Sequence, residues 1–241
     1  MSNISLFFNC NKISVNLKDG QNQTVGPAII CSWPKVNDCE RGIYICTNSQ
    51  WHQVDSCAKK SLNAKKLAIL IESPHKNEFD AIFNPLLPLN GSGGKRFSAK
   101  ILNKLASWFN GKNVSCVEVL LINPVQYQAS LYHFLNDKIS YNLSGYNGNY
   151  SKIGHDMRNQ VWEFLFETCD LKEDFLNRIR KYAPDYIVNC CTGDIRNSYK
   201  KFTNKPKKPR KPSVNNLKSY IYTSLYQLGI YYMEDKHPSS W

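Results

Sequence analysis

From residue 65 onward, short unbroken runs of apolar residues alternate with longer helix-like stretches. Residues 67–71 read Leu-Ala-Ile-Leu-Ile without polar alternation, which is typical of a strand covered on both faces. Later strand candidates occupy residues 117–122, 186–191 and 230–233, and helix-like stretches lie near 95–109, 157–168, 171–182 and 214–229. Strands that alternate with helices predict a parallel sheet with helices on its faces.

The first 60 residues follow a different pattern. They contain short β-like runs, such as residues 43–46, which Asn, Gly and Pro residues separate. We therefore predict a small β-rich N-terminal extension over residues 1–60 and an α/β domain over residues 61–241. In that domain we expect a three-layer α/β/α arrangement, with a central, mainly parallel four-stranded sheet between two layers of helices.

The charge balance favours a polyanionic partner. Lysine and arginine number 31 against 19 acidic residues, which gives a formal net charge of +12. Residues 200–212 are basic, punctuated by proline and without an amphipathic period, which predicts a solvated arm rather than a membrane-surface helix. Lys207, Lys208 and Arg210 of this arm are candidate phosphate contacts. The alternative is a loop that its charge keeps soluble.

Neither a membrane segment nor a metal site is predicted. The chain has no apolar run of bilayer length, and residues 1–10 lack the order of a secretion signal, so we expect a soluble, cytoplasmic protein without a membrane partner. The nine cysteines are odd in number and several lie inside apolar runs, which indicates reduced thiols. The cysteines at positions 31, 39, 46 and 57 lack the paired spacing of a zinc site, so no cofactor is expected.

Polar residues follow each of the predicted parallel strands. Glu72, Asn123 and Thr192 come just after the first three strands, and His237 follows the fourth. Ligands of open α/β sheets bind beyond the carboxyl ends of the strands. A carboxylate, an amide and an imidazole are therefore expected to face one cleft.

Four motifs, in this order, carry a resemblance to a known family. Glu-Ser-Pro-His at 72–75 is followed by Pro-Leu-Asn-Gly-Ser-Gly-Gly-Lys at 88–95, Leu-Leu-Ile-Asn-Pro-Val at 120–125 and His-Pro-Ser at 237–239. The set resembles uracil-DNA glycosylases, most closely the Glu-X-Pro-Gly and Pro-Phe-X-Gly-X-X-Gly motifs of the bacterial and archaeal iron–sulfur group. The cysteines do not match that group's ligand pattern, so no cluster is expected.

The resemblance covers residues from about 65 to 241 and implies a monomeric DNA glycosylase that flips a base from double-stranded DNA. Glu72 would stabilise the cationic sugar and orient water, and His237 would hydrogen-bond the departing base. Ser73 competes with Glu72, because other branches place Asp or Asn just before the proline, but serine supplies no negative charge. Alternatively, Glu72 caps a helix or loop and His237 is a solvent-exposed residue near the chain end.

Other motif positions would surround the base. Asn123 offers a donor and an acceptor for the edge of a pyrimidine, unless it simply forms a turn before proline. Leu89 stands where the family has a stacking aromatic residue, and His75 stands where some branches exclude the thymine methyl group. The polar, aromatic segment that begins near Tyr127 could contact sugars or exposed bases.

The resemblance also implies contacts with the DNA backbone and the base stack. The candidate residues are Gly91, Gly93, Gly94, Lys95, Ser239 and Trp241. The glycines would let backbone amides approach a phosphate at a helix start, and a flexible connection is the alternative. The tryptophan lies four residues after His237, where some family members carry an apolar wedge, and ordinary packing is its alternative.

The departures from the family pattern at positions 73, 75 and 89 argue against plain uracil as the substrate. We hypothesise a bulky modified pyrimidine, such as glucosylated hydroxymethylcytosine in bacteriophage DNA, whose excision would serve antiviral defence. Uracil repair is the alternative within the family. Two other classes stay open: a nonenzymatic DNA-binding module, and a hydrolase of free nucleosides or nucleotides.

Overall fold

The computed structural model describes residues 5–9, 12–16, 22–25, 35–54, 63–74, 76–80, 84–127, 129, 158–159, 161–167, 169, 171–193, 200–204, 211–213 and 216–241. These residues form an α/β structure with a six-stranded sheet and a second sheet of three strands. The second sheet pairs β1 (Ser5–Asn9), β2 (Lys12–Asn16) and β3 (Asn22–Val25) in antiparallel order.

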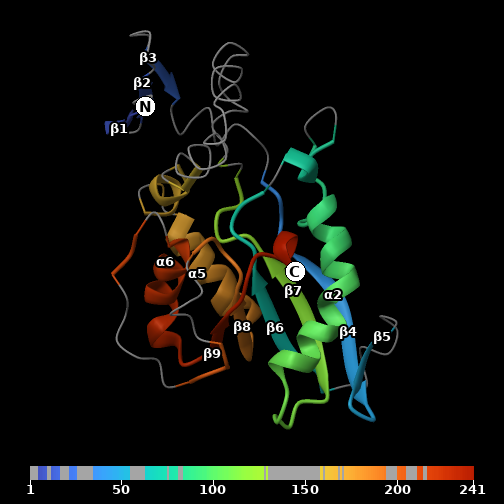
Figure 1. The fold of residues 1–241 in the computed structure, drawn as a ribbon. Helices are drawn as coiled ribbons and strands as arrows, with labels where there is room; N and C mark the ends of the chain where they lie inside the picture. The colour runs from blue at the N-terminus through green and yellow to red at the C-terminus, as the bar shows by residue number, and fades with distance from the viewer. Residues whose placement is uncertain are drawn as a thin grey trace.

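The six-stranded sheet has the order β5-β4-β7-β6-β8-β9 (Figure 1). Its strands are β4 (Cys39–Thr47), β5 (Gln50–Val54), β6 (Lys65–Leu70), β7 (Cys116–Ile122), β8 (Tyr186–Asn189) and β9 (Tyr231–Glu234). β6 pairs in parallel with both β7 and β8, and β8 pairs in parallel with β9. These are the four predicted strands, and their parallel order places their carboxyl ends along one edge.

The prediction of a four-stranded sheet was wrong, because β4 and β5 extend the sheet to six strands. β4 pairs in antiparallel order with both β7 and β5. Its two-residue hairpin turn at Asn48 and Ser49 has φ angles of 52° and 65°, which suit the right-handed twist of the strands. Part of the predicted N-terminal extension therefore belongs to the main sheet, joined by long-range pairs such as Ile43 with Glu118.

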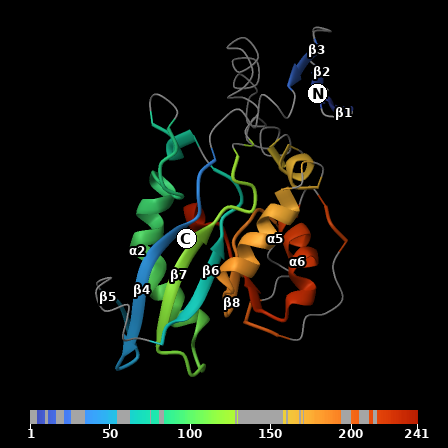
Figure 2. The same ribbon diagram turned by 180° about the vertical axis from the view of Figure 1, so that it is seen from behind.

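Helices pack on both faces of the sheet, because successive strand residues point to opposite sides. α2 (Ser92–Trp108) packs on the face that includes Leu67 and Ile69. α5 (Leu171–Tyr182), α6 (Leu217–Leu225) and residues 161–167 pack on the face that includes Ala68 and Leu70. Figure 2 shows the same elements from behind, with α5 in front of the strands. The predicted helices are confirmed, although α6 begins at Leu217 rather than near 214.

Short 3-10 helices complete the described elements: η2 (Lys76–Glu78), η4 (Tyr226–Leu228) and η5 (Pro238–Ser240). η2 and its following loop connect β6 to α2, and η5 packs against α2. Within the described part of the chain, no helix has the length and apolar character needed to cross a membrane.

Candidate functional site

The carboxyl edge of the parallel strands brings together the polar residues that follow them. Glu72 comes shortly after β6 and Asn123 directly after β7. Thr192 follows β8, and His237 follows β9. Because β7, β6, β8 and β9 are neighbours in this order, the four segments lie side by side.

Glu72 is fixed at this edge through both its backbone and its carboxylate. Its carbonyl oxygen accepts hydrogen bonds from Trp162 Nε1 at 3.0 Å and from the Val125 amide at 3.2 Å. The Thr192 amide donates to Oε2 at 2.6 Å, and Arg158 Nη2 lies 3.0 Å from Oε1. The backbone φ of Glu72 is 105°, a sparsely populated value for a residue with a Cβ, so the surroundings hold this residue in a strained conformation.

The Glu72 carboxylate is buried yet stabilised in its charged form. The residue is only 4% exposed, and burial by itself raises the pKa of such a carboxyl. The charge of Arg158, hydrogen bonding by Thr192 and the nearby His237 outweigh burial and hold the pKa of Glu72 below its ordinary value. Glu72 is therefore ionised at neutral pH, and its carboxylate accepts a backbone hydrogen bond from the Thr192 amide.

Arg158 was missed in the sequence. Its Nη2 atom lies 2.9 Å from Thr192 Oγ1 and 3.1 Å from Asn159 Oδ1, in addition to the contact with Glu72. The arginine thus belongs to the same polar cluster as the carboxylate. The available signal was indirect: a buried carboxylate requires a cationic partner, and Arg158 is the second residue of the predicted helix near 157–168.

His237 presents one ring nitrogen to its own loop. Nδ1 accepts a hydrogen bond from the Ser239 amide at 3.2 Å and lies 2.8 Å from Ser239 Oγ. When the ring is neutral, this geometry places its proton on Nε2; when the ring is protonated, it adds a positive charge near Glu72. His237 is half-buried rather than fully exposed. Ser239, predicted as a DNA contact, orients the imidazole.

Asn123 has an unusual hydrogen-bonding state. The residue is fully buried, and neither Oδ1 nor Nδ2 has a hydrogen-bond partner among the described residues. Its backbone is nevertheless anchored, because the backbone N–H of Asn123 donates a hydrogen bond to the carboxylate of Asp38. Oδ2 of the same carboxylate lies 2.8 Å from Arg178 Nη1. Buried amides without partners are rare and unfavourable, so a fixed backbone here holds a side chain with a donor and an acceptor ready for a ligand.

Lys218, also missed in the sequence, joins two of the loops. Its amide donates to the Thr192 carbonyl at 3.3 Å, and its carbonyl accepts from Asn189 Nδ2 at 3.3 Å. Its buried Nζ donates to the Asp235 carbonyl at 2.7 Å, just before His237. Lys218, in the first turn of α6, therefore connects the loop of Thr192, which binds Glu72, to the segment that runs from Asp235 to His237.

Leu89 lies in the core beneath the start of α2. It is buried within the α2-side core, and its amide donates to Glu78 Oε1 at 2.9 Å. A Cβ added to Gly94 would lie 1.8 Å from the Leu89 carbonyl oxygen, so only glycine fits there. The glycine turn is thus a close packing of backbone on backbone, rather than a flexible connection.

The predicted phosphate contacts at Gly91, Gly93, Gly94 and Lys95 lie at the start of α2. Gly91 is the N-cap with φ 123°, and the first turn contains no acidic residue. Lys95 is exposed there, and a Cβ on Gly93 would meet only ordinary contacts. Arg96 Nη1 donates to the Ser239 carbonyl, which joins this helix start to the His237 loop.

Trp241 packs against α2. Its ring lies 5.7 Å from that of Phe97 and 5.6 Å from that of Trp108, measured between centroids. The indole Nε1 donates to the Lys236 carbonyl at 2.7 Å. These contacts match the packing alternative, and they occupy the ring that a wedge would need.

Comparisons with known proteins found no match for this chain. No family model matches it, and no curated protein or solved structure matches it.

The remaining predicted site residues divide into two groups. Ser73 is half-buried next to Glu72, and Tyr127 is half-buried with Lys35 Nζ 5.5 Å from its ring centroid. The others, His75, Lys207, Lys208 and Arg210, lie outside the described residues, as does most of the aromatic segment after Tyr127.

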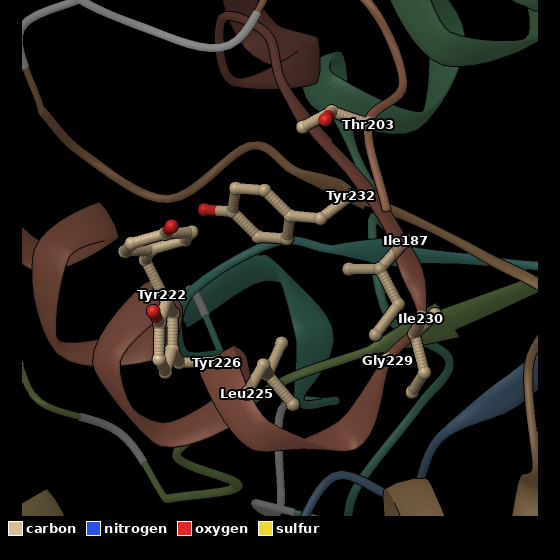
Figure 3. Close-up of a pocket in the computed structure, with 8 residues that line it drawn as sticks. All are labelled: Ile187, Thr203, Tyr222, Leu225, Tyr226, Gly229, Ile230 and Tyr232. Carbon is tan, nitrogen blue, oxygen red and sulfur yellow. The ribbon is translucent and has the colours of Figure 1, made fainter. Parts of the chain in front are cut away.

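A separate shallow pocket lies between α6 and the β8–β9 edge (Figure 3), with about 320 Å³ of space that includes open solvent. Its lining residues are Ile187, Thr203, Tyr222, Leu225, Tyr226, Gly229, Ile230 and Tyr232. This set contains none of the predicted site residues, so the pocket is distinct from the polar cluster.

Metal-ligating side chains do not cluster in the described part of the chain. No group of three or more His, Cys, Asp or Glu side chains there could hold an ion. The described cysteines, Cys39, Cys46, Cys116, Cys169, Cys190 and Cys191, are free thiols. Burial raises the pKa of Cys190 and of Cys191 well above that of an ordinary thiol, which makes both poor nucleophiles.

Proposed function

We propose that this chain is a DNA glycosylase that flips a base out of the duplex and hydrolyses its N-glycosidic bond. The observation that carries the proposal is the ionised, buried carboxylate of Glu72 beside His237, at the edge where the side-chain amide of Asn123 has no partner among the described residues. The proposed arrangement is that of the uracil-DNA glycosylases, with β7-β6-β8-β9 as the shared parallel strands and β4 and β5 as additions.

In the proposed reaction, Glu72 acts mainly through its charge. The C1′–N bond breaks with its electron pair leaving on the base, which produces a cationic sugar and an anionic base. A carboxylate with a lowered pKa is a weak proton acceptor but a good electrostatic partner for the cation. Arg158 and Thr192 use two of its roughly four lone-pair sites, so the others can orient the attacking water. The water oxygen bonds to C1′ and its proton leaves to solvent.

His237 and Asn123 would act on the base. The Nε2–H of His237 donates to the base oxygen on which negative charge develops, while Ser239 keeps the ring in that tautomer. The buried Asn123 amide offers its donor and acceptor to the edge of a pyrimidine. For the substrate we propose a bulky modified pyrimidine such as glucosylated hydroxymethylcytosine, because the stacking aromatic residue of the family is replaced by Leu89, a core residue here.

One observation favours a second candidate, a nonenzymatic DNA-binding module. Arg158 lies 3.0 Å from the Glu72 carboxylate, and an ion-paired carboxylate presents a weaker field to a sugar cation. In this case the net charge of +12 would provide DNA binding without base excision.

The test is to incubate the protein with duplexes that carry uracil, hypoxanthine, methylated, hydroxymethylated or glucosylated pyrimidines, and to identify released bases by mass spectrometry. Glu72→Gln is expected to lower release by about 10²- to 10⁴-fold and His237→Gln by about 10²-fold. Glu167→Gln, a surface change in an ion pair with Lys172, is the matched control and should retain activity. Release of nucleotides, or full activity of Glu72→Gln, would reject the proposal. DNA binding without any release would support the binding module.

A further inference from the structure

An exposed apolar tip lies in the segment between η2 and α2. Leu86 is 39% exposed and Leu87 is 56% exposed, and Pro85 before them is exposed as well. Single exposed apolar residues are common, but three in succession form a small surface. We refer to residues 85–87 as the apolar tip.

The tip is held at both ends by polar contacts. The Leu86 amide donates to the Glu78 carbonyl at 2.7 Å, and Arg41 Nη2 donates to the Pro88 carbonyl at 2.5 Å. Before the tip, the Asn84 amide donates to Asp80 Oδ1 at 2.8 Å. A preorganised tip loses little conformational freedom when it enters a partner.

The position of the tip points to DNA as the partner. The segment from η2 to α2 lies at the end of the sheet where α2 starts (Figure 1), and Glu78 binds both Leu86 and Leu89. The basic first turn of α2 follows directly, with Lys95 exposed. At the same helix start, Arg96 contacts the His237 loop. Apolar side chains flanked by cations at the rim of the proposed site suit a duplex, whose stacked bases are apolar and whose phosphates are anionic.

We propose that Leu86 and Leu87 insert into the base stack at the place that the flipped nucleotide leaves. The inference rests on the proposed DNA function and assigns the wedge to the apolar tip instead of Trp241, whose ring packs on Phe97 and Trp108. Leucine is among the side chains that wedge between base steps and separate them.

The test uses a duplex with 2-aminopurine next to the target base, because the fluorescence of this base rises when it unstacks, whether or not a base is released. The wild-type chain should raise the fluorescence on binding. The double variant Leu86→Ala/Leu87→Ala should abolish most of that rise and lower base release by about tenfold or more, with phosphate-driven binding weakened much less. Both side chains are exposed, so the variant should keep its melting temperature, and Leu87→Ala alone should give a partial loss.

Two control variants sharpen the result. Leu102→Ala removes a leucine that is 37% exposed on α2, so it controls for loss of apolar surface and should leave the fluorescence rise intact. Trp241→Phe should also retain the rise. A double variant that unstacks DNA like the wild type would overturn the inference, as would loss of the rise in Trp241→Phe alone. If the fluorescence rise depends on Leu86 and Leu87 but no duplex releases a base, the wedge is supported and the glycosylase proposal is rejected. Failure of the wedge can therefore be distinguished from failure of the proposed function.

Discussion

Replacing Arg158 by methionine tests whether the Glu72 carboxylate depends on one cationic partner. Arg158 Nη2 lies 3.0 Å from Glu72 Oε1. At an effective dielectric constant of about 20, Coulomb's law gives an attraction of about 5 kcal/mol for this separation. The arginine side chain is 23% exposed, and the Thr192 hydrogen bond would remain in the variant, so we expect a net loss of about 3 kcal/mol in the free energy of unfolding at pH 7.

The pH dependence of that loss has a definite sign. The pKa of Glu72 is lowered in the folded protein, so its stabilising contribution is present above its ordinary value of 4.5 and is lost as pH falls through the lower folded pKa. Without Arg158, burial dominates and the pKa of Glu72 rises. The protonated acid no longer needs a cation, so the stability difference between variant and wild type should shrink as pH falls from the raised pKa of Glu72 in the variant to its lowered pKa in the wild type.

Denaturant unfolding at several pH values measures this effect. Arg180→Met is the matched control, because its ion pair with Glu173 spans 2.7 Å but the side chains are 50% and 60% exposed. This surface pair should contribute less than about 1 kcal/mol. The double variant Arg158→Met/Glu72→Gln should recover part of the lost stability, since the unpaired charge is gone. If Arg158→Met were as stable as the control at every pH, the account of a charged, arginine-held Glu72 would be refuted.

Two further predictions concern the supports of the site. Lys218→Met removes the hydrogen bond to the Asp235 carbonyl, so the turn before His237 loses its anchor. We expect kcat for base release to fall by about tenfold with KM nearly unchanged. If the fall in activity were no larger than the fraction of unfolded protein measured by circular dichroism, this prediction would be contradicted. Gly94→Ala should destabilise the protein by about 1–3 kcal/mol, because its Cβ would meet the Leu89 carbonyl at 1.8 Å. Gly93→Ala, whose Cβ meets only a leucine methyl at 3.4 Å, should be neutral or slightly stabilising in the same thermal unfolding experiment.

The parallel strands and their polar ends could be predicted because they leave a local signature. Residues 67–71 and 119–122 are buried on both faces, so they read as unbroken apolar runs. Parallel pairing then forces Glu72 and Asn123 to the same edge without any knowledge of side-chain contacts. The membership of β4 in this sheet had no such signature, because it depends on the pairing of β4 with β7, a strand that lies far away in the sequence.

The partners of Glu72 and His237 could not be predicted for a related reason. Arg158 and Lys218 are single charged residues in predicted helices, where a lysine or arginine usually faces solvent. Their roles arise only when the fold brings them to the carboxyl edge. Trp241 shows the converse case: its spacing from His237 suggested a wedge, but spacing says nothing about whether a ring is already packed.

Three local costs meet at Glu72, and their coincidence supports function over a purely structural role. The residue has a φ of 105°, its carboxylate is buried, and its charge needs an arginine that is itself largely buried. A well-packed apolar residue in an ordinary conformation would avoid all three, and buried ion pairs often contribute little net stability compared with such residues. A site selected for stability alone would have little reason to retain this arrangement. A site that must hold a negative charge next to a developing sugar cation requires an ionised carboxylate in a fixed orientation, which the strained backbone, Thr192 and Arg158 together provide.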